Sequence, residues 1–202
     1  MTRPVDNLLA LAVLSYLTQG PMHPYELGRT LQQHGDARSI RYRHASLYMV
    51  VDRLAAAGLI VAVDTGREGA RPERTRYALT DAGQAELTGW LRELLAEPAH
   101  EYPHLVAALA FLGALAPEEV VAALDRRLLG LATVRTETAG IVEEATVGGV
   151  HPLFLVEEEY RLTVLDAERG FVQSLRSRID DPATGWRTAW SRPTDNQEVP
   201  SP

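Results

Sequence analysis

The sequence predicts a mainly α protein with one small β-hairpin, organised as an N-terminal winged helix-turn-helix followed by a C-terminal helical dimerisation region. Two observations carry this prediction. Apolar residues recur every three or four positions over most of the 202 residues, which is the spacing of amphipathic helices. Two short β-like runs follow the third such segment, and helix, helix, helix, hairpin is the element order of a winged helix-turn-helix.

The net charge of −7 is unevenly distributed along the chain. Residues 1–79 hold ten Arg against seven Asp and Glu, whereas residues 80–202 hold ten Arg against twenty Asp and Glu. A basic part joined to an acidic part is typical of chains in which one part faces nucleic acid. We therefore expect a winged-helix DNA-binding domain over residues 1–80, a helical dimerisation and effector domain over 81–180, and a disordered tail over 181–202.

Composition excludes several other classes of protein. The chain has no cysteine, so disulfides and thiolate chemistry are impossible. It starts without a basic-then-apolar leader, and its apolar runs stay well below the ~20 residues of a membrane-spanning helix. We therefore expect a cytoplasmic protein with no membrane partner. Glycine-rich phosphate loops and a nucleophile elbow are missing too, so the sequence predicts no enzyme activity, no catalytic residue and no cofactor.

Two helices are expected before the DNA-reading element. The first, Val5–Leu17, is apolar nearly all round, which predicts burial on more than one side, under its own domain and against a second subunit. A second helix should begin at Pro24, because proline fits a first helical position, and run to about Gln33.

Residues 45–60 form the stretch around which the N-terminal half is organised. Its apolar stripe of four residues has the 0, +3, +4, +7 spacing of a buried helix face: Leu47, Val50, Val51 and Leu54. Gly58 is expected to end this helix in the left-handed conformation. The outward face consists of small, polar and aromatic side chains: Ala45, Tyr48, Met49, Asp52 and Ala56, with Ser46 and Arg53 at its margins. Such a face suits a DNA major groove, and an ordinary amphipathic surface helix is the alternative.

The hairpin is predicted from two β-like runs, Leu59–Thr65 and Thr75–Leu79. The loop between them is rich in glycine and arginine. Four arginines bracket it and are suited to phosphates or a minor groove: Arg67, Arg71, Arg74 and Arg76. We expect this hairpin to be the wing; a solvated charged loop is the alternative.

The sequence predicts helices along most of the second half of the chain. Thr80 is expected to cap a helix that ends before Pro98 and carries Leu87, Trp90, Leu91, Leu94 and Leu95 on one face. Further helices are expected over 103–115, 117–145 and 153–179. The last one has an apolar stripe that alternates by three and four: Leu153, Val156, Tyr160, Val164, Ala167, Phe171, Leu175 and Ile179. Two long helices of this kind predict an antiparallel hairpin that contributes to a dimer contact, with packing inside one chain alone as the alternative.

Several motifs in order resemble the PadR family of transcriptional regulators over residues 5–95. They are His23–Leu27, Ser46–Tyr48 followed by Arg53–Leu54, Gly58–Ile60, and Tyr77–Gly83. The resemblance implies a homodimeric winged-helix repressor with C-terminal dimerisation helices and, in some members, an effector pocket near the dimer interface. It makes Tyr25, Ser46 and Tyr48 candidate DNA contacts. The chain departs from the family at Pro24, where glycine is common, and at Met49, where proline is common.

Double-stranded DNA, a second copy of the chain and a small apolar or aromatic effector are thus the predicted partners. Arginines supply phosphate contacts, and groove-facing side chains read base edges. The predicted DNA-contacting residues are Tyr25, Arg43, His44, Ser46, Tyr48, Met49, Arg53, Arg67, Arg71, Arg74 and Arg76. Candidate effector-binding residues combine apolar rings with polar atoms: Trp90, Tyr102, His104, Phe111 and Tyr160. Core or dimer-seam packing is the alternative reading of these aromatic residues.

A rival hypothesis rests on His100, Glu101 and His104, which match the H-E-x-x-H pattern of zinc proteases. That chemistry needs both histidines one turn apart on a continuous helix, and Pro103 should interrupt such a helix. We therefore predict no metal site, with a metal sensor or zinc hydrolase as one alternative function and a winged-helix protein-interaction adaptor as the other.

Overall fold

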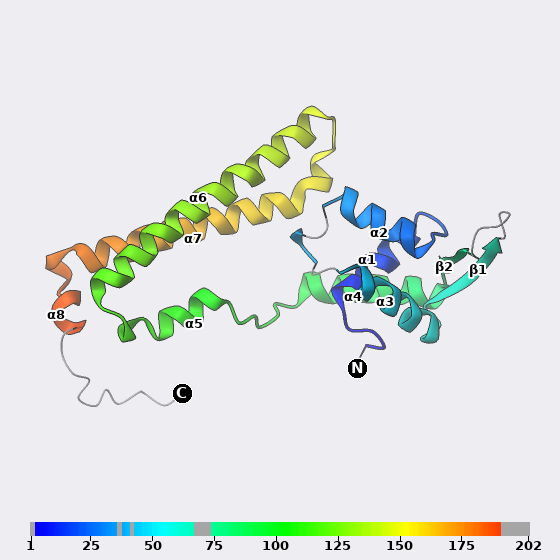
Figure 1. Cartoon of the computed structure of the whole chain (residues 1–202), viewed down its shortest axis with the longest axis horizontal. Coiled ribbons are helices and arrows are strands. Elements are labelled where there is room, and N and C mark those ends of the chain that lie inside the picture. The colour runs from blue at the N-terminus through cyan, green and yellow to red at the C-terminus, as the bar shows by residue number, and fades with distance from the viewer. Residues whose placement is uncertain (1–2, 36–37, 41–42, 67–73, 191–202) are drawn as a thin grey trace. The chain divides into compact units, whose positions relative to one another are not determined.

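The computed structural model describes residues 3–35, 38–40, 43–66 and 74–190 and divides the chain into two compact units, residues 1–101 and 102–202 (Figure 1). Unit 1 contains α1 (Leu8–Leu17), α2 (Pro24–Gln33), α3 (His44–Ala56), β1 (Ile60–Gly66), β2 (Arg74–Leu79) and α4 (Asp81–Ala96). Mostly helical structure with one antiparallel hairpin confirms the predicted fold class. The division falls later than the expected boundary at residue 80, because α4 packs against α1 and belongs to unit 1.

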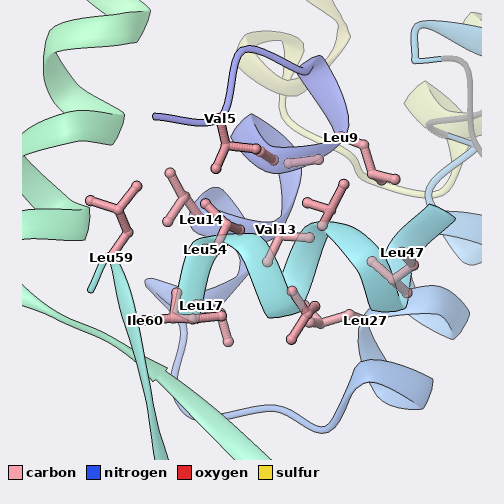
Figure 2. Close-up of a cluster of buried hydrophobic side chains, with 14 of the residues drawn as sticks. Val5, Leu9, Val13, Leu14, Leu17, Leu27, Leu47, Leu54, Leu59 and Ile60 are labelled. Carbon is pink, nitrogen blue, oxygen red and sulfur yellow. The ribbon is translucent and has the colours of Figure 1, made fainter. Parts of the chain in front are cut away.

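Unit 1 is built around the fully buried side chains of α1, α2 and α3. Figure 2 shows Leu9 and Val13 of α1 facing Leu27 of α2 and the α3 residues Leu47 and Leu54 in one apolar cluster. Leu14, which is turned by about 100° from Val13 around the helix axis, is buried as well. The prediction that α1 is buried on more than one side is confirmed within unit 1, since its apolar residues meet α2, α3 and α4 together.

The sequence His-Pro-Tyr-Glu forms the first turn of α2, and each of its residues has a role in starting the helix. The N-cap residue His23 accepts a hydrogen bond from the Tyr25 backbone N–H through Nδ1 (3.0 Å), and Glu26 accepts one from the His23 backbone N–H (2.8 Å). This is a capping box with histidine in the place usually taken by serine or threonine. Pro24 occupies the first helical position, where the missing N–H has no consequence.

The end of α3 is fixed by the chain reversal at Gly58. Gly58 has φ +70°, the left-handed conformation predicted for it. The backbone N–H of Leu59 donates to the carbonyl of Leu54 (3.0 Å), which satisfies an acceptor of the last helical turn. The next residue, Ile60, already belongs to β1.

The hairpin and α4 are joined to the end of α3 at close range. β1 and β2 pair antiparallel, with Ile60 opposite Leu79. Thr80, the predicted N-cap of α4, accepts a hydrogen bond from the Gly83 N–H (3.0 Å) and donates through its hydroxyl to the Gly58 carbonyl (2.8 Å). A Cβ atom on Gly83 would lie 2.0 Å from the Leu59 carbonyl oxygen, so the close approach of α4 to this strand end requires glycine.

Unit 2 is a helical hairpin with short helices at one end. It contains α5 (His104–Ala110), η2 (Leu112–Ala114), α6 (Pro117–Val147), η3 (Pro152–Leu155), α7 (Val156–Asp180), η4 (Pro182–Thr184) and α8 (Trp186–Trp190). Figure 1 shows α6 and α7 running antiparallel along their lengths, which confirms the predicted hairpin. Its core gathers near the start of α6 and the end of α7, from Val120, Leu124, Leu131, Val172, Leu175 and Ile179.

Polar pairs continue the α6–α7 contact outside this core. Arg127 pairs with Glu168, and Arg135 donates to Asp166 through two nitrogens, at 2.6 and 3.0 Å. The hydrogen bond from Arg135 lowers the pKa of the Asp166 carboxyl below its ordinary value. Within the acidic run Glu157–Glu159, Glu158 is buried and accepts a hydrogen bond from Arg161 (3.1 Å).

The apolar stripe predicted for the last helix only partly faces α6. Leu175 and Ile179 are buried in the core, whereas Tyr160, Val164 and Phe171 are exposed. From Ala167 onward the predicted stripe advances by four residues at each step, to Phe171, Leu175 and Ile179, and each step turns it by about 40° around the helix. Only its last members therefore reach the buried face, which Leu165 and Val172 occupy earlier in α7.

The segment expected to be a disordered tail begins with ordered structure. The η4 and α8 elements occupy residues 182–184 and 186–190, and Trp186 and Trp190 pack against the unit 2 core. The Arg187 guanidinium binds the Asp180 and Glu118 carboxylates. Residues 191–202 lie outside the described residues.

Candidate nucleic-acid interface

The outer face of α3 carries the central group of predicted contact residues. Leu47, Val50, Val51 and Leu54 are all buried, as the spacing predicts. On the opposite side, Met49 is 58% exposed and Tyr48 is 43% exposed. Asp52 and Arg53 are exposed too, and neither side chain has a hydrogen bond or ion pair with another part of the described chain. This face therefore offers an acceptor, a cation, a phenol and an apolar side chain to an external ligand.

The first turn of α3 contains Ser46, which is not the N-cap of this helix. The N-cap is Arg43, whose backbone is extended, and the helix starts at His44 without a side-chain cap. Ser46 therefore lies inside the first turn, half-buried, and its hydroxyl does not cap the helix. Arg43 is exposed beside it. The backbone of His44 is helical, and its side chain lies outside what the structure describes.

Tyr25 extends the exposed surface from α2. Its ring is 57% exposed, next to the capping box that fixes the first turn of this helix. The capping box thus holds the exposed Tyr25 phenol at a fixed place at the start of α2.

The wing arginines divide into described and undescribed residues. Arg67 and Arg71 lie outside the described residues, and Arg74 is described only as the first residue of β2. Arg76 is exposed and donates a hydrogen bond to the Pro21 carbonyl in the turn after α1. Next to it, Met22 and Tyr77 exchange backbone hydrogen bonds (3.0 and 2.9 Å) and join this turn to the hairpin. Arg76 thus stabilises the base of the wing, a role that the sequence analysis did not foresee.

A shallow groove of about 430 Å³ lies beside Arg76. Its lining includes Glu26, Arg29 and Thr30 of α2 together with Gln19, Gly20, Pro21 and Met22. Arg29 is a surface cation of this groove that the sequence does not predict, because a single arginine on the exposed side of a helix carries no distinguishing pattern.

The five candidate effector residues are distributed over both units. Trp90 is buried in the unit 1 core, where the Arg3 guanidinium lies 4.8 Å from its ring centre and also pairs with Glu86 (2.6 Å). Core packing is therefore the role of Trp90, since a ligand could reach it only by opening the core. The other four residues belong to unit 2 and are exposed: Tyr102, His104, Phe111 and Tyr160. Their part in an effector site stays a prediction.

The zinc-protease pattern lacks the helix that its chemistry needs. α4 ends at Ala96, and α5 begins at His104 with Pro103 as its N-cap. His100 and Glu101 therefore precede the helix instead of sharing it with His104, so the one-turn spacing of the two histidines is not formed. Within the part of the chain that the structure describes, no group of three or more His, Cys, Asp or Glu residues could hold a metal ion.

Three helices, an antiparallel hairpin and an exposed third-helix face define unit 1 as a winged helix-turn-helix domain. Residues 13–89 match the family described as the Transcriptional regulator PadR-like family. Unit 1 thus carries a PadR-like domain, and this match confirms the resemblance seen in its motifs.

Solved structures share the fold at low sequence identity. PadR of Bacillus subtilis in complex with operator DNA matches with a TM-score of 0.67 and 21% identity, covering 85% of this chain and 99% of that one. The same protein in complex with p-coumaric acid matches with a TM-score of 0.69 and 19% identity, covering 86% and 99%. The virulence activator AphA of Vibrio cholerae matches with a TM-score of 0.64 and 14% identity, covering 85% and 98%. A comparison with curated proteins finds no significant match.

None of the helices in the described residues is both long enough and apolar enough to cross a bilayer.

Proposed function

We propose that this protein is a cytoplasmic transcriptional repressor that binds a palindromic DNA site as a homodimer. The observation that carries the proposal is the outer face of α3, where Tyr48, Met49, Asp52 and Arg53 are exposed above a fully buried apolar stripe. A helix held in this way by the core of a winged helix-turn-helix is the element that enters a major groove in such domains.

Affinity and selectivity come from different residues in this proposal. Arg43, Arg53 and the wing arginines contact phosphates and supply the salt-dependent part of binding. Tyr25 and Ser46 donate hydroxyl groups to phosphates and fix the position of the domain on the duplex. The central residues of the α3 face read base edges.

The proposed dimer rests on unit 2. Tyr160, Val164 and Phe171 form an apolar strip on α7 that is turned away from α6 and remains exposed. Contiguous apolar surface of this kind marks an interaction site. A second copy of the chain is the partner that supplies an identical strip, and a two-fold dimer also explains why a palindromic site would be read. Half-sites then lie about 34 Å apart, one turn of DNA.

An aromatic effector is a further part of the proposal. Tyr102, Phe111 and Tyr160 are exposed aromatic side chains of unit 2, and His104 adds a polar ring. A small aromatic compound that binds one dimer arrangement more tightly than another would change the separation of the two α3 helices and release DNA. The complex of Bacillus subtilis PadR with p-coumaric acid supports this class of ligand.

The test is selection of genomic fragments by the purified full-length protein, followed by sequencing. We expect enrichment of fragments that share one palindrome, and their release by members of a panel of aromatic compounds that includes p-coumaric acid. Recovery of no enriched DNA would favour the protein-interaction adaptor. Stoichiometric zinc together with peptide cleavage that Glu101→Gln abolishes would favour the hydrolase instead.

A further inference from the structure

The α3 face has a centre and two flanks, and these differ in chemistry. Successive residues of an α-helix are turned by about 100° around its axis. With the buried residues Leu47, Val50, Val51 and Leu54 as the core direction, four exposed residues lie within roughly 40° of the opposite direction. These residues, the central strip, are Ala45, Met49, Asp52 and Ala56.

Tyr48 and Arg53 lie on opposite flanks of the central strip. By the same angular spacing, each is turned about 60–80° from the outward direction, Tyr48 to one side and Arg53 to the other. A helix seated in a major groove directs its flanks at the two sugar–phosphate backbones and its centre at the base edges. Tyr48 and Arg53 therefore position the helix, and the central strip is left to read sequence.

Met49 and Asp52 are the two members of the central strip with side chains longer than a methyl group. They are three residues apart, which places them about 4.5 Å apart along the helix axis. This is about 1 Å more than the rise of roughly 3.4 Å between neighbouring base pairs, so the two side chains can reach adjacent pairs. Ala45 and Ala56 on either side leave space for close approach of the groove floor.

The described residues give the Asp52 carboxylate no partner that would divert it from DNA. Its carboxylate is exposed and makes no hydrogen bond or ion pair within the described part of the chain. A carboxylate is an acceptor only, so it is repelled by the phosphates and by the two acceptor atoms of guanine. The cytosine amino group offers the donor that it needs in the major groove.

We infer that Met49 and Asp52 are the specificity-determining pair of this protein, with Asp52 selecting cytosine and Met49 contacting the methyl group of a neighbouring thymine. This inference rests on the proposed DNA-binding function and assigns which residues of the same face choose the sequence. Asp52 acts largely by exclusion, since a carboxylate facing guanine acceptors is repelled.

The experiment is selection from a random duplex library by the full-length wild type and by Asp52→Asn, followed by sequencing of bound DNA. Wild type should prefer cytosine at one symmetric position of each half-site by about tenfold, the ratio that corresponds to ~1.4 kcal/mol. Asp52→Asn should shift that position to adenine, because an asparagine amide pairs with adenine. In Met49→Ala, the preference for thymine at the neighbouring position should fall.

Two control variants separate base reading from charge. Glu97→Gln removes the same charge from the exposed end of α4 and should leave all base preferences unchanged. Arg53→Ala should weaken binding to all sequences similarly and keep the cytosine position. An unchanged base preference in Asp52→Asn would overturn the inference while the proposed function stands, whereas a wild type that enriches no DNA would overturn both.

Discussion

Gly83 is the position where one added methyl group should have the largest effect on the DNA-binding unit. Its ideal Cβ would lie 2.0 Å from the Leu59 carbonyl oxygen and 2.8 Å from Leu79 Cδ1. The nearer atom belongs to the backbone at the α3–β1 junction and cannot move aside without displacing that junction. Overpacking typically costs about 1–3 kcal/mol, and a backbone clash places Gly83→Ala at the upper end of that range. The gain of about 1 kcal/mol in helix propensity offsets part of this cost.

Gly89 on the same helix provides the matched control. A Cβ at Gly89 meets no atom within 4 Å, so Gly89→Ala should stabilise unit 1 by about 0.5–1 kcal/mol through helix propensity alone. We expect the two variants to differ by roughly 2–3 kcal/mol in the free energy of unfolding. Amide hydrogen exchange of α1 peptides in a urea series reports this unit separately from unit 2. Equal stability of the two variants would refute the close approach of α4 to Leu59.

The remaining predictions concern binding, assembly and pH. Arg53→Ala should reduce the slope of log binding constant against log salt concentration by about one, because one phosphate contact is lost. The control Arg126→Ala in unit 2 should leave the slope unchanged. Equal slopes for Arg53→Ala and wild type would show that Arg53 does not contact phosphate. Phe171→Arg should weaken the dimer at least ~100-fold in sedimentation equilibrium, because a two-fold interface contains the residue twice at about 1.5–3 kcal/mol each. Thr163→Arg is its control, and no difference would exclude this strip. Arg135→Gln should raise the pKa of Asp166 toward its ordinary value in an NMR titration.

The sign of the last prediction follows from the direction of the shift. A carboxyl whose pKa is lowered in the folded state contributes stability above its ordinary pKa and loses it as pH falls through the folded value. The Arg135–Asp166 contact should therefore weaken only at acidic pH, and it is absent at every pH in Arg135→Gln. An Asp166 pKa that is the same in both proteins would contradict the hydrogen bond as the cause.

Local signals made unit 1 predictable from the sequence. Proline at the first position of α2, glycine after α3 and threonine before α4 each mark a helix boundary by their own chemistry. The buried stripe of α3 follows from its spacing alone, and so does the exposed face with Tyr48 and Met49.

Contacts between distant residues escaped prediction. The bond from Arg76 to the Pro21 carbonyl joins residues 55 positions apart, and no local pattern specifies it. The clash that makes Gly83 necessary likewise depends on where Leu59 lies in space. In α7, Glu158 is buried and Tyr160 is exposed, because the buried face follows the seven-residue spacing Glu158, Leu165, Val172 and Ile179, which the predicted stripe joins only at Ile179.

The central claim is that the outer face of α3 reads DNA. The most direct measurement is fluorescence anisotropy of a selected duplex and a scrambled duplex with wild type and Tyr48→Ala, with hydrogen exchange of α1 confirming that both proteins are folded. Wild type should prefer the selected duplex, and Tyr48→Ala should bind it about tenfold more weakly, which corresponds to roughly 1.4 kcal/mol for one lost charge-assisted hydrogen bond. Unchanged affinity of a folded Tyr48→Ala protein for the selected duplex would contradict the claim.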